Sequence, residues 1–355
     1  MRYGALTEAL EKRGLDACWC TDPSNRRYLS GFTGSAGALL IHPSSRKLFT
    51  DSRYTAQAKK EAQGFEIVEC AGGETASKVA AACRDLGVRR LGFEEDRVPV
   101  SGHRRMQELL GPEVELVWAG DILSSMRSVK TPDEIERVRE ASAAADEAFC
   151  RICGVVEPGM REQDVALEID CLLRKKCGAT AFDTIAASGP NSALPHAKPG
   201  GRLLQKGDAL VLDFGAACDG YCSDFTRTIF IGAIDKALRS VYNVVRNAQE
   251  AALSGIRAGM ACRDADALAR NVVIEAGYGG CFGHGLGHGV GLDVHEAPRV
   301  SPAADGVLEE GMVITVEPGV YIEGTGGVRI EDLCVVREDR LEILTRATRD
   351  IIIID

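Results

Sequence analysis

Two aspartates frame a predicted β-hairpin in the second half of this 355-residue chain. Asp213 ends one apolar run and Asp224 opens the next, while Asp-Gly at 219–220 is typical of a two-residue hairpin turn. With this turn, Asp213 faces Thr226 and Asp224 is its diagonal neighbour on the same face, because side chains alternate along a strand. Two ionised carboxylates this close repel each other, and two divalent metal ions about 3.5–4 Å apart would remove the repulsion. Taken alone, two aspartates on a hairpin are more often part of a solvated face.

Two further acids lie near the end of the chain. Glu317 follows a β-branched run at 312–316. We expect a strand over residues 327–336, with Arg329 and Glu331 on the same face. Four carboxylates directed at one centre would be very costly to bury without a metal. Arg329 would offset one of these charges and orient Glu331, whereas in isolation the two residues would form a surface ion pair.

Four of the six histidines fall in two loops. His284, His288 and His295 lie in the segment FGHGLGHGVGLDVHE, and His196 lies in the matching loop of the preceding half. Glycine at every second position from 283 to 291 is incompatible with a stable helix, so His284 and His288 do not form the helical zinc motif. Repeated glycine instead indicates a backbone that passes close to another group. A lone loop histidine is usually just exposed, but four histidines in paired loops beside four acids favour a functional site.

These residues belong to two copies of a weak internal repeat. The segment EPGMREQD at 157–164 recurs as RAGMACRD at 257–264, and each copy lies between two helical stretches. The segment LQKGDALVLDFG at 204–215 recurs as LEEGMVITVEPG at 308–319, which places Asp213 on Glu317. We expect two half-domains packed around a pseudo-twofold axis, each contributing acids to the centre. Chance similarity of short glycine motifs is the alternative.

The N-terminal part has a different pattern, in which helical stretches alternate with short apolar runs. This alternation predicts an α/β layer domain. The expected helices are 6–13, 56–62 and 75–86, and the expected strands are 17–20, 38–41, 65–69 and 90–93. The residues TPDE at 131–134 are typical of a helix start. We therefore divide the chain into domains 1–125 and 126–355, in keeping with its length.

Composition excludes several classes of function. The formal net charge of −10 opposes binding to nucleic acid or to an anionic membrane surface. No apolar run approaches the roughly 18 residues of a membrane-spanning helix, and charged residues interrupt the start of the chain where a secretory signal would be apolar. The thirteen cysteines are an odd number and are scattered, which indicates a reducing cytoplasm rather than a disulfide framework.

The whole set resembles the pita-bread metallopeptidases, the family of methionine aminopeptidase, prolidase and aminopeptidase P. The resemblance lies in HGLGHGVGLDVHE, VEPGVY and GVRIED and in the ordered acids and histidine. It implies an α+β pita-bread catalytic domain with an internal pseudo-twofold repeat over 126–355. It also implies an α/β creatinase/prolidase-type domain over 1–125, which methionine aminopeptidases lack. Creatinase, which has the fold without a metal site, is disfavoured because every ligand position is filled.

The resemblance also assigns roles to the site residues. It implies two divalent metal ions, with Mn²⁺ favoured and Co²⁺ or Zn²⁺ as alternatives, and a bridging water that attacks the amide. The implied metal ligands are Asp213, Asp224, His288, Glu317 and Glu331. Glu317 would also act as general base, His196 and His295 would contact the scissile amide, and His284 and Arg329 would serve substrate binding.

Within this branch, the segments at 28–37 and 49–55 look more like those of aminopeptidase P. We therefore predict a cytoplasmic Xaa-Pro aminopeptidase that releases the first residue from Xaa-Pro-Yaa peptides, with an Xaa-Pro dipeptidase (prolidase) as the alternative. A non-catalytic peptide-binding protein of the same fold is a further alternative that the complete ligand set opposes. The family usually forms dimers, so we expect a homodimer in which Arg53 or Tyr54 reaches the substrate of the neighbouring subunit.

Overall fold

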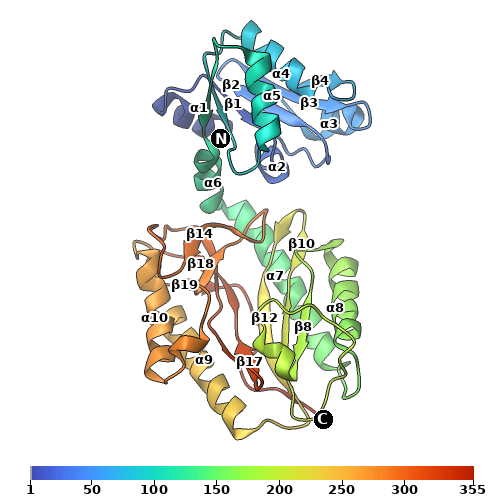
Figure 1. Cartoon of the computed structure of the whole chain (residues 1–355), viewed down its shortest axis with the longest axis vertical. Helices are drawn as coiled ribbons and strands as arrows, with labels where there is room; N and C mark the ends of the chain where they lie inside the picture. Colours follow the sequence, from blue (N-terminus) through green and yellow to red (C-terminus); the bar gives the residue numbers. More distant parts are fainter. Residues whose placement is uncertain (1) are drawn as a thin grey trace. The chain divides into compact units, whose positions relative to one another are not determined.

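The computed structural model describes residues 2–355, and the chain divides into two compact units between Arg127 and Ser128. The division lies two residues after the predicted domain limit at 125/126. Each unit has its own hydrophobic core, and each is described by itself below (Figure 1).

The N-terminal unit is built on one six-stranded sheet in the order β4-β3-β2-β1-β5-β6. Its strands are β1 (Ala17–Cys20), β2 (Ala38–His42), β3 (Ser45–Asp51), β4 (Glu66–Cys70), β5 (Arg90–Phe93) and β6 (Glu115–Trp118). Its helices are α1 (Arg2–Lys12), α2 (Pro23–Ser30), α3 (Thr55–Glu61), α4 (Thr75–Asp85), α5 (Val100–Leu110) and α6 (Gly120–Ser128). Alternate residues of β1 enter two different cores, which shows that both faces of the sheet are covered. The predicted α/β layer domain is confirmed.

The C-terminal unit contains two pairs of helices, and strands follow each pair along the chain. Its helices are α7 (Pro132–Cys153), α8 (Glu162–Cys177), α9 (Lys236–Gly255) and α10 (Cys262–Glu275), with 3₁₀ turns η1 (Gly189–Ala193) and η2 (Gly279–Cys281). Thr131 caps α7: its hydroxyl accepts from the Glu134 N–H, and the Glu134 carboxylate accepts from the Thr131 N–H. This reciprocal capping box confirms the predicted helix start.

Two sheets face these helices. The first has the order β20-β12-β9-β8 and the second β14-β13-β15-β18-β19, and two small sheets, β11-β10-β7 and β16-β17, complete the unit. The strands of the first half are β7 (Ala179–Thr180), β8 (Ile185–Ser188), β9 (Ala209–Phe214), β10 (Ala216–Cys218), β11 (Tyr221–Cys222) and β12 (Phe225–Ile231). The later strands are β13 (Gly287–Gly289), β14 (Glu296–Val300), β15 (Val313–Val316), β16 (Gly319–Ile322), β17 (Gly326–Arg329), β18 (Asp332–Val336), β19 (Leu341–Ile343) and β20 (Ile353–Ile354).

The two halves of this unit repeat the same contacts, so the internal repeat is confirmed. The N–H of Gly159 donates to Leu204 O at 2.9 Å, and the N–H of Gly259 donates to Leu308 O at 2.8 Å. Helices α7 and α8 pack with β8, β9 and β12 in one core, and α9 and α10 pack with β15 and β18 in another. Figure 1 shows the two helix pairs on opposite sides of the strands. The site residues come from the strands between them.

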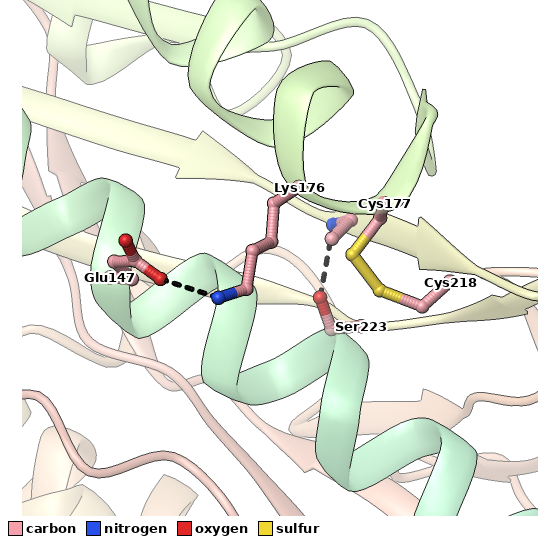
Figure 2. The surroundings of a disulfide bond; sticks show 6 residues. Glu147, Lys176, Cys177, Cys218 and Ser223 are labelled. Carbon is pink, nitrogen blue, oxygen red and sulfur yellow. Dashed lines mark hydrogen bonds and ion pairs between the residues drawn. A yellow bond between two sulfur atoms is a disulfide. The ribbon is translucent and has the colours of Figure 1, made fainter.

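One pair of cysteines departs from the expected reduced state. Cys177, the last residue of α8, forms a disulfide with Cys218 at the end of β10, and their Cα atoms are 4.6 Å apart. Within residues 2–355 the eleven other cysteines are free. Figure 2 shows the bridge next to the Lys176–Glu147 ion pair and to Ser223, whose hydroxyl accepts from a backbone N–H. The bridge ties α8 to the hairpin that carries the first pair of acids.

No helix within residues 2–355 is both long enough and apolar enough to cross a membrane.

Candidate metal centre

The hairpin has the register that the sequence predicts. Ala217 pairs with Cys222 and Cys218 with Tyr221, which leaves the Asp-Gly at 219–220 as a two-residue turn. Both turn residues have positive φ, 44° and 74°, as a type I′ turn requires. Further along the ladder Thr226 pairs with Asp213. The predicted placement of Asp213 is therefore confirmed, and Asp224 lies between β11 and β12.

The predicted single strand over 327–336 is wrong. The structure has two strands, β17 and β18, which belong to different sheets, and Glu331 lies in the break between them. The break arises because β17 pairs with β16 while β18 pairs with β15. At the break, the N–H of Glu331 donates to Thr226 O at 3.1 Å. The second half of the repeat therefore places Glu331 next to β12, the strand that pairs with Asp213.

Four of the five predicted ligands meet at one point, and the charge of the fifth, Asp213, helps to raise the pKa of Asp224. One oxygen or nitrogen each of Asp224, His288 and Glu331 lies within 4.8 Å of the others, a spacing that suits a metal ion. His288 Nε2 is 3.5 Å from Asp224 Oδ2 and 3.3 Å from Glu317 Oε1. Asp213 joins the group through Arg329, whose Nη2 donates to Asp213 Oδ2 at 2.5 Å. These five residues are those predicted as ligands.

Two details of the donor set fit a cation. His288 Nδ1 is 3.1 Å from Gly289 O. Assigning one ring proton to Nδ1 on that contact makes Nε2 the nitrogen that faces the acids and would bind a cation after losing its own proton, the arrangement typical of metal-binding histidines. In addition, Glu331 Oε1 is buried and has no hydrogen-bond partner among the described residues. A buried carboxylate oxygen without a partner is costly unless a cation meets it.

The electrostatics of these side chains point the same way. Burial, together with repulsion from neighbouring acids, raises the pKa of Asp224 and of Glu331 well above the usual range. Burial alone would lower the pKa of His288, but its hydrogen bond to Glu317 and the charges of Glu317 and Asp224 outweigh this and raise the pKa to about 9. Protons are therefore held where divalent cations would otherwise balance the negative charge.

Arg329 occupies a different place from the one expected. Its side chain is only 4% exposed, and its Nε and Nη1 donate to Thr226 Oγ1 at 3.1 Å and to Tyr321 Oη at 2.7 Å. It pairs with Asp213 rather than with Glu331, which it reaches only through the Thr226 hydroxyl. Burial on protein partners favours a positioning role over the expected contact with substrate.

Two hydroxyl groups complete the site and were not predicted. Thr315 Oγ1 donates to Glu317 Oε1 at 3.2 Å and accepts from the His288 N–H at 3.0 Å. Tyr321 Oη lies 3.0 Å from His284 Nε2, and burial raises the pKa of Tyr321 to about 12. Side chains alternate along a strand, so Thr315 lies on the same face as Glu317. This spacing would have predicted that the threonine belongs to the site. The VEPGVY motif contains Tyr321, but its partners lie on separate strands and loops.

The remaining histidines border this cluster. His284 Nδ1 lies 2.7 Å from Gly285 O, so its proton is assigned there and Nε2 accepts from Tyr321. The ring of His295 is exposed and its centroid lies 4.3 Å from that of His288. Partial removal of the His295 ring from water lowers its pKa, and the charges of His288 and His196 lower it further. His196 is also exposed, in the loop after η1.

Sequence and structure comparisons define the class of this protein. The model of metallopeptidase family M24 matches residues 136–338, and that of the creatinase/prolidase N-terminal domain matches residues 2–129. The chain therefore belongs to metallopeptidase family M24, and it has the pita-bread catalytic fold preceded by a creatinase-type domain. It is a hydrolase of the proline-specific branch of that family.

Full-length similarity extends to particular members. An Xaa-Pro dipeptidase from Bacillus anthracis shares 41% identity with a TM-score of 0.96, covering 99% of each chain. The Xaa-Pro dipeptidase of Pyrococcus furiosus is 33% identical over 353 residues, 99% of both sequences. An X-Pro aminopeptidase from Thermotoga maritima shares 39% identity with a TM-score of 0.89, over 97% of this chain and 99% of that one. The dipeptidase alternative is thus better supported than the aminopeptidase prediction.

Proposed function

We propose that this protein is a metal-dependent Xaa-Pro dipeptidase, which hydrolyses the amide bond between the first residue and proline. The observation that carries the proposal is the buried cluster of Asp224, His288 and Glu331, in which one carboxylate oxygen has no partner within the described chain. The match over nearly the whole length to proteins named Xaa-Pro dipeptidase supports the substrate class.

Release of the first residue from longer Xaa-Pro-Yaa peptides is the second candidate. The similarity to the X-Pro aminopeptidase of Thermotoga maritima favours it, as do the segments at 28–37 and 49–55. Both candidates cleave the same bond and differ only in whether the substrate continues beyond the proline.

We assign the metal site to five side chains. Asp213, Asp224, His288, Glu317 and Glu331 would hold two divalent cations, with Mn²⁺ preferred and Co²⁺ or Zn²⁺ as alternatives. Mixed carboxylate and imidazole ligands suit all three ions. When bound, such a pair of cations makes water a stronger acid and polarises the scissile carbonyl.

Glu317 is the proposed general base. Burial would raise the pKa of Glu317, but the hydrogen bond and charge of His288 outweigh it, and the pKa is lowered. Its carboxylate is therefore ionised at neutral pH and able to take a proton from the attacking water. Thr315 Oγ1 donates to Oε1 and fixes the orientation of the carboxylate.

The exposed histidines act on the substrate side of this proposal. His295 and His196 would donate hydrogen bonds to the scissile amide and to the oxyanion that forms from its carbonyl. The lowered pKa of His295 favours the neutral ring, which retains one N–H donor. His284, held by Tyr321, would form part of the wall against the prolyl ring.

A homodimer is also proposed, in which Arg53 or Tyr54 of one copy reaches the substrate of the other. In this chain the guanidinium of Arg53 pairs with Asp51 through Nε and Nη2, at 2.9 and 2.8 Å, and its side chain is 71% exposed. Sedimentation tests the proposal: an active monomer with an unchanged substrate range would remove it.

The deciding experiment uses metal-stripped protein reloaded with Mn²⁺, Co²⁺ or Zn²⁺. Each form is incubated with an Xaa-Pro dipeptide and with an Xaa-Pro-Yaa tripeptide, and products are read by mass. Cleavage of the dipeptide alone is the expected result. Release of Xaa from the tripeptide would establish the aminopeptidase instead. Cleavage of neither peptide by protein with two bound metals would overturn proline-specific hydrolysis.

A further inference from the structure

A buried ion pair lies at the end of the histidine loop, where Glu296 directly follows His295. Lys130 Nζ is 2.8 Å from Glu296 Oε1, and the two side chains are 1% and 8% exposed. Taking two charges out of water costs several kcal/mol per ion, and their attraction often only balances that cost. Such a pair is therefore better explained by the geometry it imposes than by the stability it adds.

Lys130 is fixed on its own side. Its N–H donates to Gly311 O at 3.0 Å, its Nζ also donates to Ser128 O at 3.1 Å, and its neighbour Val129 bridges to Met312. This segment runs directly before α7 and lies against the start of β15, the strand that leads to Glu317. The ammonium group is thus held in one place by backbone contacts.

Glu296 connects this fixed point to the histidine loop. It is the first residue of β14 and directly follows His295. Its carboxylate lies against the backbone of Gly291, where a Cβ would come within 2.0 Å of Oε1. Gly291 O in turn accepts from the N–H of Cys222 at 2.7 Å, two residues before Asp224. One carboxylate therefore touches both ends of the loop 291–296 that presents His295.

We propose that Lys130 is a positioning residue for the reaction: through Glu296 it closes the loop 291–296 and holds His295 over His288. Residues 291–295 of the loop are bends rather than regular secondary structure, and the ring of His295 is exposed. Within the loop, the Gly291 N–H donates to Asp293 O at 3.0 Å, a contact that does not reach His295. Positioning of a group that acts on the scissile amide is worth about a hundredfold per ångström of misplacement.

The structural part of this proposal can be tested without an activity assay. Hydrogen–deuterium exchange of metal-free protein compares the wild type with Lys130→Met and Glu296→Gln over peptides that span 290–297. We expect faster exchange in this segment in both variants. Arg139→Met is the matched control, because it removes an ion pair between α7 and Glu342 that lies outside the site. Exchange at 290–297 that equals that of the wild type in both variants would overturn the proposal.

The catalytic part rests on the proposed function and uses a double-variant cycle. With an Xaa-Pro dipeptide, Lys130→Met should lower kcat about tenfold or more with little change in KM, and Arg139→Met should not. In a His295→Ala background, Lys130→Met should cost nothing further, because it acts through that histidine. A full additional loss would overturn the positioning role. A wild type that cleaves no Xaa-Pro substrate would overturn the proposed function, while the exchange experiment still decides the role of Lys130 in the loop.

Discussion

The hydroxyl of Thr226 donates a 2.7 Å hydrogen bond to Oε2 of Glu331, 105 positions later in the chain. The same residue faces Asp213 across the β9–β12 ladder, and its carbonyl accepts from the Glu331 N–H. Thr226 therefore joins an acid of the first half to an acid of the second. The candidate metal centre depends on these contacts of Thr226, which link the two halves of the repeat.

Replacing Thr226 by valine tests these contacts. The change keeps the shape of the side chain, removes the donor to Glu331 and removes the acceptor for Arg329 Nε. Groups that orient a metal ligand in this way typically contribute about 10–100-fold to metal affinity. We expect a loss of that size in Mn²⁺ affinity by calorimetric titration, with the fold retained.

Thr228→Val is the control for this change. Thr228 lies two residues further along β12 and its hydroxyl also contacts the second half, but through the backbone of Arg329. Thr228→Val should lower the free energy of unfolding by about 1 kcal/mol, as should Thr226→Val. It should leave the metal affinity unchanged. Equal affinity losses in the two variants would mean that general destabilisation, not orientation of Glu331, is responsible.

The parts of the site that the sequence predicts are those governed by local rules. Asp213 faces Thr226 because a two-residue turn and a period of two fix the register of a hairpin. Glu331 was expected within one long strand, and the break there depends on two different pairing partners, β16 and β15. Neither partner can be identified from the segment itself.

The hydroxyl and ion-pair partners of the site residues were missed for the same reason, because they come from distant segments of the chain. Tyr321 meets His284 from another segment of the chain, and Lys130 meets Glu296 across most of the C-terminal unit's sequence. In the N-terminal unit, four of the six strands were predicted, whereas β3 and β6 were missed, because both begin with polar residues and are partly exposed. Residue types and spacing therefore indicate the ligands, and only the fold shows what orients them.

Asp224→Asn tests the assignment of the metal ligands. The amide keeps the shape of the side chain but supplies a neutral, weaker donor, so we expect fewer than two metal ions per chain and a loss of turnover above about a hundredfold. Asp219→Asn makes the same change in the turn of the same hairpin, where asparagine tolerates the positive φ of 44°. Metal content by mass spectrometry should stay at two in this control. Two tightly bound metals in Asp224→Asn would exclude Asp224 as a ligand.

Removal of metal should make stability depend on pH. The pKa of His288 is raised to about 9 in the metal-free site, so its protonated form stabilises the folded state fully below pH 6.5. This contribution is lost as pH rises from 6.5 to 9 and amounts to about 3 kcal/mol. The raised pKa values of Asp224 and Glu331 act in the same direction, because the folded state holds protons that the unfolded chain has released. We expect urea unfolding of stripped protein to require less denaturant at about pH 9 than at pH 6.5.

Two comparisons control this measurement. Protein loaded with Mn²⁺ should show a flatter profile, since cations take the place of the protons. Stripped His288→Asn should lose the part of the slope that lies between pH 6.5 and 9. A slope unaffected by both the metal and the substitution would assign the pH dependence to groups elsewhere in the chain.

Tyr321→Phe separates the substrate pocket from the metal centre. The phenol donates to His284 Nε2 and accepts from Arg329 Nη1, so its loss releases the imidazole proposed to face the prolyl ring. Arg329 still pairs with Asp213 in this variant. We expect KM for an Xaa-Pro dipeptide to rise about tenfold, the equivalent of one hydrogen bond to a charged or polar partner, with a smaller change in kcat and unchanged metal content.

Tyr242→Phe, which removes a buried hydroxyl bonded to the carbonyls of Arg349 and Asp350, provides the control and should leave KM unaltered. A fall in kcat at constant KM would instead place Tyr321 with the reacting groups, because an interaction made only in the transition state changes kcat alone.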